Sequence, residues 1–224
     1  MTEEKWLAGD LKKMLKYLHR HGSERKRRLF ACACCRRQWR QFIGPQCHEA
    51  LEVAERYADG LATRPELYDA EVRAHEAYGI CRDRGEPANM DAADAVYAAA
   101  CAEVGWDIAE AAADRAARAA AGYAARGQAK AAKATEAAAQ LVLLRDVFGN
   151  PFRPVAFEPA WRTSDVLLLA TGIYDEQAFD RMPILADALQ DAGCTADELL
   201  NHLREPRATH IRGCWALDLV LGKE

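Results

Sequence analysis

Apolar residues recur every three or four positions along most of the chain, the spacing of one face of an α-helix. The first stripe consists of Leu11, Met14, Leu15 and Leu18, and it follows Asp10, a residue type that caps helix starts. Further helices are predicted after Ser23, from about Gln46 to Tyr57, and from Thr63 to about Gly79. No stretch alternates cleanly between apolar and polar positions, so the pattern predicts no β-sheet.

The middle of the chain is dominated by alanine. Residues 91–140 contain 25 alanines and no proline. Because alanine is the best helix former, we predict one helix from Asn89 to about Arg126 and a second helix that ends near Val147. Gly127 permits the turn between them. The expected result is an antiparallel helical hairpin, which either projects from the body of the protein or packs along it.

The segment 148–154 interrupts the helical pattern. It contains two prolines, a glycine and an asparagine, which cannot continue a helix. We expect a joint that aromatic side chains fix to the C-terminal region, which consists of short helices, the last running from Thr209 to Leu221. The expected structural anchors are Phe148, Phe152, Trp161 and Trp215.

These elements together predict an all-α fold. We expect a helical bundle with a long alanine-rich helical hairpin and a C-terminal group of short helices, at least about 60% helical and well above the ordinary share. The expected regions are 1–88 with a basic helix, 89–147 as the hairpin, and 148–224 as the joint and the short helices, all within one continuous body.

Composition excludes several classes of protein. Of the 224 residues, 50% are hydrophobic, 8% aromatic and 29% charged, which is not typical of a disordered tail, a collagen-like fibre or a disulfide mini-protein. No stretch approaches the roughly 18 apolar residues that span a membrane. The chain opens MTEEKW, with acids where a secretory signal carries bases. We therefore expect a soluble cytoplasmic protein with no membrane partner.

Basic residues gather near the N-terminus. Residues 1–40 contain 12 Lys/Arg and 4 Asp/Glu, a net charge of +8, so the total of −4 leaves −12 on the other 184 residues. Such a face could bind a polyanion or attract the acidic remainder of the same fold, and the second interpretation is favoured because it needs no partner. The residues that would contact nucleic acid are Arg25, Lys26, Arg27, Arg28, Arg36, Arg37 and Arg40.

The pattern of the eight cysteines favours reduced thiols packed in the core over disulfides or metal ligands. Cys32, Cys34 and Cys35 lie on a predicted helix, where neighbours are poorly placed to form disulfides, and we expect them to be reduced, buried and free of metal. Together with Cys47 and His48 they nevertheless form one candidate zinc cluster.

A second candidate zinc site lies near the C-terminus. Its residues are Cys194, His202, His210 and Cys214, with the spacing C-x7-H-x7-H-x3-C. Two thiolates and two imidazoles suit tetrahedral zinc, although this spacing matches no familiar zinc knuckle. Core cysteines and surface histidines are the favoured interpretation, so no cofactor is expected and zinc is the alternative.

No assembled catalytic motif is present in the sequence. It contains neither G-x-S-x-G, nor a phosphate-binding G-x-x-x-x-G-K-[ST], nor G-x-G-x-x-G. The chain is therefore more readily interpreted as a non-enzymatic protein than as an enzyme.

Four segments resemble a known sequence family. They are RRLFACACCRR at 27–37, VAERYADGLAT at 53–63, LLRDVFGNPFRPV at 143–155 and HIRGCWALDLVLGK at 210–223. The combination resembles an uncharacterised bacterial family that occurs as many paralogues in large genomes. The resemblance implies a helical module of unassigned function and supplies no catalytic residues.

The leading hypothesis is a non-enzymatic helical interaction or scaffold module with an unidentified protein partner. The alternatives are a nucleic-acid-associated accessory protein that uses the basic N-terminal helix, and a zinc-binding protein that uses the Cys/His clusters.

Overall fold

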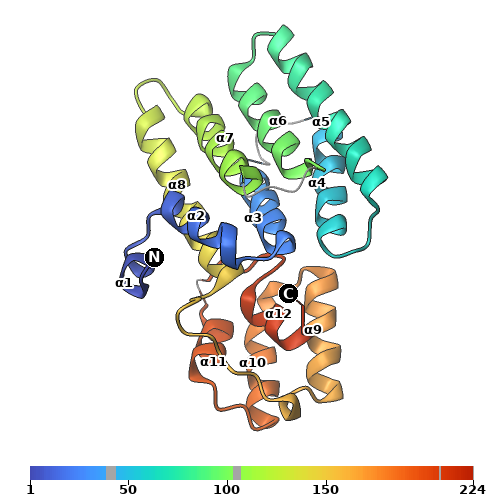
Figure 1. Cartoon of the computed structure of the whole chain (residues 1–224), viewed down its shortest axis with the longest axis vertical. Helices are drawn as coiled ribbons and strands as arrows, with labels where there is room; N and C mark the ends of the chain where they lie inside the picture. Colours follow the sequence, from blue (N-terminus) through green and yellow to red (C-terminus); the bar gives the residue numbers. More distant parts are fainter. Residues whose placement is uncertain (39–43, 103–106, 207, 224) are drawn as a thin grey trace. The chain divides into compact units, whose positions relative to one another are not determined.

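The computed structural model of the protein describes residues 1–38, 44–102, 107–206 and 208–223. Of these residues 75% are helical and none is in a strand, which confirms the all-α prediction. The chain divides into two compact units, residues 3–142 and residues 143–224 (Figure 1). No helix within the described ranges is both long enough and apolar enough to span a membrane.

Three helices of the first unit, those that follow Asp10, Ser23 and Thr63, begin where capping residues predict them. Asp10 accepts a hydrogen bond from the backbone N–H of Lys13, and Thr63 and Glu66 form the expected capping box. The helices are α1 (Glu3–Ala8), α2 (Leu11–His21), α3 (Glu24–Arg36), α4 (Pro45–Ala58), α5 (Arg64–Asp83), α6 (Pro87–Ala100), α7 (Asp107–Tyr123) and α8 (Ala129–Phe148), the last turns of which belong to the second unit.

Helix α3 is central to the first unit and packs against α4, α6 and α7. Cys32, Cys34 and Cys35 are buried in it beside Leu29 and Phe30, as predicted, and no disulfide occurs among the described residues. Burial raises the pKa of each of these three thiols, because a buried thiolate would lose its hydration. The thiols therefore fill space in the core and are poor nucleophiles.

The alanine-rich region differs from the prediction. The single helix expected from Asn89 to about Arg126 is wrong, because α6 ends at Ala100 and the backbone of Cys101 is no longer helical, with ψ 126°. Helices α6 and α7 are instead two antiparallel helices, and this pair belongs to the same compact unit as α3–α5, so the expected boundary at 88/89 is not a unit boundary. High helix propensity did not reveal this break, which coincides with a tertiary contact: the Arg28 guanidinium donates to the carbonyls of Ala99 and Cys101.

Close approach of α6 and α7 depends on a glycine. A Cβ at Gly122 would lie 2.8 Å from the Cβ of Ala88 and 3.2 Å from its Cα. We expect Gly122→Ala to destabilise the protein by about 1–3 kcal/mol through overpacking, although alanine is the better helix former.

The matched control is Gly79→Ala in α5, where a Cβ would meet nothing within 4 Å. This change should stabilise the helix by up to about 1 kcal/mol. Urea denaturation of the two variants measures both effects, and equal effects of the two substitutions would contradict the close packing of α6 on α7.

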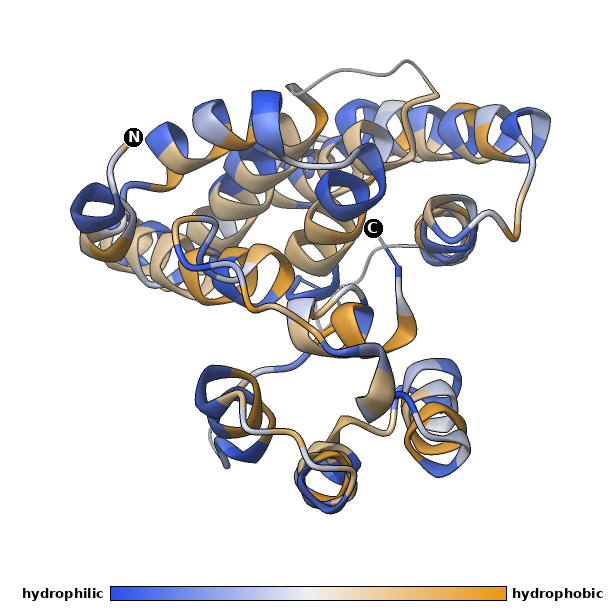
Figure 2. Cartoon of the chain, turned by 60° about the horizontal axis from the view of Figure 1, so that its bottom comes forward, coloured by the Kyte–Doolittle hydropathy of each residue, from blue (hydrophilic) through white to orange (hydrophobic). Residues whose placement is uncertain are grey.

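The second unit is a group of short helices around its own core. They are α9 (Ser164–Glu176), α10 (Met182–Asp191), α11 (Asp197–Arg204) and α12 (Trp215–Leu221), with single 3-10 turns at Pro159–Trp161 and Phe179–Arg181. Figure 2 shows helices of this unit end-on, with hydrophobic positions on one side of each helix and hydrophilic positions on the other. Ile173, Leu185, Leu189 and Leu217 are fully or almost fully buried in the core.

Of the four expected anchors, Trp161 is buried in this core and Trp215 packs against it. Phe148 and Phe152 are only half-buried, and Phe157 contacts Trp161 edge-on at a ring-centroid distance of 5.3 Å. The second unit begins at Leu143 rather than at the expected 148, because its first residues are the last turns of α8.

Candidate metal centre

Four side chains with metal-ligating atoms converge within the second unit. They are Asp146, His202, His210 and Cys214, hereafter the C-terminal cluster, and their ligand atoms all lie within 4.8 Å of one another. Across the ranges that the structure describes, no other group of three or more Asp, Glu, His or Cys side chains is arranged in this way. Cys194, which the sequence pattern grouped with the last three, is buried in the core outside the cluster, and Asp146 occupies the fourth place.

Three separate segments supply the cluster. Asp146 lies in the last turn of α8 and His202 in the last turn of α11. His210 and Cys214 lie on either side of a tight turn in which Gly213 has φ +88° and the Cys214 N–H donates to the Ile211 carbonyl at 3.0 Å.

The helix predicted from Thr209 to Leu221 is therefore wrong in its first half. Helix α12 begins only at Trp215, because Gly213 adopts a left-handed conformation that ends regular helix geometry. A turn, and not helical i, i+4 spacing, brings His210 close to Cys214.

The distances within the cluster resemble the edges of a small tetrahedron. His210 Nδ1 lies 3.0 Å and His202 Nε2 lies 3.2 Å from the same oxygen, Asp146 Oδ1. Cys214 Sγ lies 3.2 Å from His202 Nε2 and 3.7 Å from His210 Nδ1. A tetrahedral zinc ion with ordinary bond lengths to nitrogen, oxygen and sulfur would hold such atoms about 3.3–3.6 Å apart. Three of the four distances are 0.1–0.3 Å shorter than that range and the fourth is 0.1 Å longer, so small shifts of these side chains would admit one tetrahedral ion.

The same geometry disfavours a Cys-His-Asp catalytic triad. In a triad the histidine uses one ring nitrogen toward the acid and the other toward the nucleophile. Here a single nitrogen of each ring faces both Asp146 and Cys214. One N–H can hydrogen-bond Asp146 Oδ1, but it cannot also point at the sulfur. The Cys214 thiol also hydrogen-bonds the Asp146 carboxylate, so this carboxylate is the common partner of all three side chains, and one cation at their centre would be shared by the same four groups.

Burial and hydrogen bonding set the protonation of Asp146. Burial alone would raise its pKa, but hydrogen bonds from His202 and His210 outweigh burial and hold the pKa below its usual range. The second carboxylate oxygen, Oδ2, accepts the backbone N–H of Ile211 at 3.0 Å. Such an outer contact fixes the orientation of a ligating carboxylate.

Cys214 is a poor nucleophile without a metal. Its side chain is fully buried, and burial together with the Asp146 charge raises the pKa of the thiol well above its ordinary value. The backbone N–H groups of Ala216 and Leu217 act in the opposite direction. A metal cation would deprotonate a coordinating thiol outright and release its proton, so metal affinity should rise with pH.

The basic residues of the N-terminal region are largely engaged within the first unit. Arg36 pairs with Glu55 through both carboxylate oxygens, and Arg37 pairs with Glu136. Other charge-assisted pairs join Arg25 to Asp59 and Arg28 to Glu24. These contacts agree with the interpretation in which the basic region pairs with acids of the same fold.

The remaining basic candidates add little to a nucleic-acid surface. Arg27 donates to the His19 carbonyl at 3.0 Å, and the Lys26 residue is half-buried. Arg40 lies outside the described residues.

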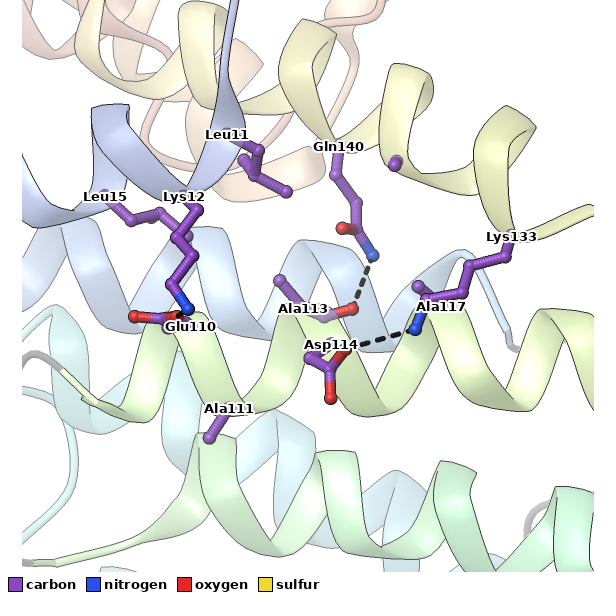
Figure 3. A pocket seen from close by; sticks show the side chains of 11 residues that line it. Leu11, Lys12, Leu15, Glu110, Ala111, Ala113, Asp114, Ala117, Lys133 and Gln140 are labelled. Carbon is purple, nitrogen blue, oxygen red and sulfur yellow. Dashed lines mark hydrogen bonds and ion pairs between the residues drawn. The ribbon is translucent and has the colours of Figure 1, made fainter. Parts of the chain in front are cut away.

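A groove of about 610 Å³ lies in the first unit among α2, α7 and α8 (Figure 3). Its charged side chains pair with each other, Lys12 with Glu110 at 3.5 Å and Lys133 with Asp114 at 3.4 Å. Gln140 donates to the Ala113 carbonyl at 2.9 Å. Because these polar groups already have partners, the groove is a weaker candidate than the C-terminal cluster.

Comparison with family models, with curated proteins and with solved structures found no match to this chain. The function is therefore inferred from the cluster itself.

Proposed function

We propose that this protein is a zinc-binding helical module whose C-terminal cluster holds one zinc ion. The observation that carries the proposal is the convergence of four ligand atoms, supplied by three separate segments, within 4.8 Å of one another and with four of their separations between 3.0 and 3.7 Å. Imidazole and thiolate ligands favour zinc over magnesium and calcium, which prefer oxygen ligands.

The proposed ion has a structural role. A catalytic zinc ion keeps a coordination position open for water or substrate, whereas four protein ligands close the tetrahedron. Asp146 and Cys214 are buried, and so is the His210 side chain. The ion would join the end of α8, the end of α11 and the turn before α12. We therefore propose a non-enzymatic scaffold role. We propose no nucleic-acid partner, because Arg25, Arg36 and Arg37 already pair with acidic side chains of the same unit.

Cobalt substitution tests the ligand set. Titration of the metal-free full chain with Co²⁺ is expected to produce the visible bands of a tetrahedral ion and a near-ultraviolet charge-transfer band from the Cys214 thiolate. The charge-transfer band should saturate at one ion per chain. Cys214→Ser should abolish it, because the oxygen that replaces sulfur does not give this transition.

Cys194→Ser is the matched control, since Cys194 is a buried cysteine of the same unit that lies outside the cluster. Its titration should match that of the unsubstituted protein. Loss of the charge-transfer band on Cys194→Ser but not on Cys214→Ser would contradict the proposed ligand set, as would octahedral spectra for the unsubstituted protein.

A further inference from the structure

The indole of Trp215 lies between two of the segments that supply the C-terminal cluster. It contacts the ring of His202, at a centroid distance of 4.9 Å and an interplanar angle of 45°. It also lies against Gly149, where a Cβ would come within 3.0 Å of the Trp215 Cγ and 3.2 Å of Cδ2. Gly149 ends the helix that carries Asp146, and Trp215 directly follows Cys214.

His202 is the ligand best placed to leave the cluster. Its side chain is 21% exposed, whereas the side chains of Asp146 and His210 are 3% and 5% exposed and Cys214 is fully buried. It also lies in the last turn of an eight-residue helix, α11, and ends of short helices open most readily. Release of a zinc ion from four protein ligands begins with the loss of one of them, so the contact that holds His202 should control the rate.

We infer that Trp215, seated on Gly149, is a positioning residue that retains the His202 ring and thereby sets the rate at which zinc leaves the site. The inference rests on the proposed zinc site and adds the regulation of metal exchange to it. Gly149 is suited to this role for two reasons: its φ of +61° favours glycine, and the absence of a Cβ leaves room for the close approach of the indole.

Zinc transfer from the loaded full chain to an excess of a chromogenic chelator measures the release rate. We expect Trp215→Ala to release zinc at least about tenfold faster, and Trp215→Phe to restore most of the slow rate, because a phenyl ring still covers His202. Gly149→Ala should also accelerate release, since the added methyl group displaces the indole. The unfolding midpoint of the metal-free Trp215→Phe variant should stay close to that of the unsubstituted protein.

Two control variants separate this role from a general loss of stability. Gly193→Ala places alanine at another left-handed glycine of the same unit, φ +86°, where a Cβ would meet nothing within 4 Å. Trp161→Phe alters a core tryptophan outside the cluster. Neither change should alter the release rate by more than about twofold.

Release rates of Trp215→Ala and Gly149→Ala that equal the rates of the two control variants would overturn the inference while the zinc site stands. A Trp215→Ala variant that no longer retains zinc would support it only if Gly149→Ala also accelerates release and Gly193→Ala does not. If the unsubstituted protein takes up no zinc, the proposed function itself fails before any rate is compared.

Discussion

Removal of zinc by a chelator is expected to destabilise the second unit by about 4 kcal/mol or more. A ligand that binds only the folded state stabilises it by about 4 kcal/mol when its free concentration is a thousand times the dissociation constant, and structural zinc sites commonly exceed that ratio. Without the ion, only hydrogen bonds within the cluster join the turn that carries His210 and Cys214 to α8 and α11. Hydrogen exchange of the full chain, with and without EDTA, should show lost protection in α11 and α12.

Helices α4, α5 and α6 serve as the internal control, since they belong to the first unit and contain no residue of the C-terminal cluster. Their protection should not change on chelation. A Cys214→Ser variant should respond much less to EDTA than the unsubstituted protein does. Equal protection of α11 and α12 before and after chelation of a zinc-loaded sample would contradict a structural role for the ion.

Arg28→Ala is expected to destabilise the first unit by about 3–5 kcal/mol. The Arg28 side chain is 1% exposed, donates to the carbonyls of Ala99 and Cys101 at 2.9 Å each, and lies over the ring of Tyr57 at 5.1 Å. Its removal leaves two carbonyls at the end of α6 without that donor and opens a cavity in place of a large side chain. Urea denaturation followed by far-ultraviolet circular dichroism measures the effect.

Arg27→Ala is the adjacent control. Its guanidinium donates to the His19 carbonyl in an exposed setting, where loss of a hydrogen bond costs about 1 kcal/mol or less. The two variants also distinguish a basic helix that binds a polyanion from one that pairs with acids of the same fold. If the helix binds a polyanion, Arg27→Ala should weaken salt-dependent binding of nucleic acid more than it lowers the free energy of unfolding. Similar stability losses for the two variants would contradict the structural role assigned to Arg28.

Local sequence signals predicted three helix starts in the first unit, because capping is a local interaction. Asp10, Ser23 and Thr63 each accept the expected backbone N–H, and their helices begin at the next residue. The break after Ala100 was not predictable from propensity, since it coincides with hydrogen bonds from Arg28, more than seventy residues earlier in the chain.

The C-terminal cluster was only partly predictable for the same reason. The spacing of His202, His210 and Cys214 brought three of its members together, but sequence proximity wrongly favoured Cys194 over Asp146. One signal could have indicated Asp146. It lies three residues after Leu143 and next to Val147, on the buried face of a helix, where an acid needs partners.

The most direct test of the zinc proposal is the zinc content of the whole chain. The protein is purified without a histidine tag, and its zinc is measured by inductively coupled plasma mass spectrometry. We expect close to one zinc ion per chain, retained after dialysis against metal-free buffer. We also expect little zinc in a His210→Ala, Cys214→Ser double variant and full zinc content in Cys194→Ser. A chain that carries no zinc after expression and reconstitution with the metal, or a double variant that retains as much zinc as the unsubstituted protein, would contradict the proposed zinc site.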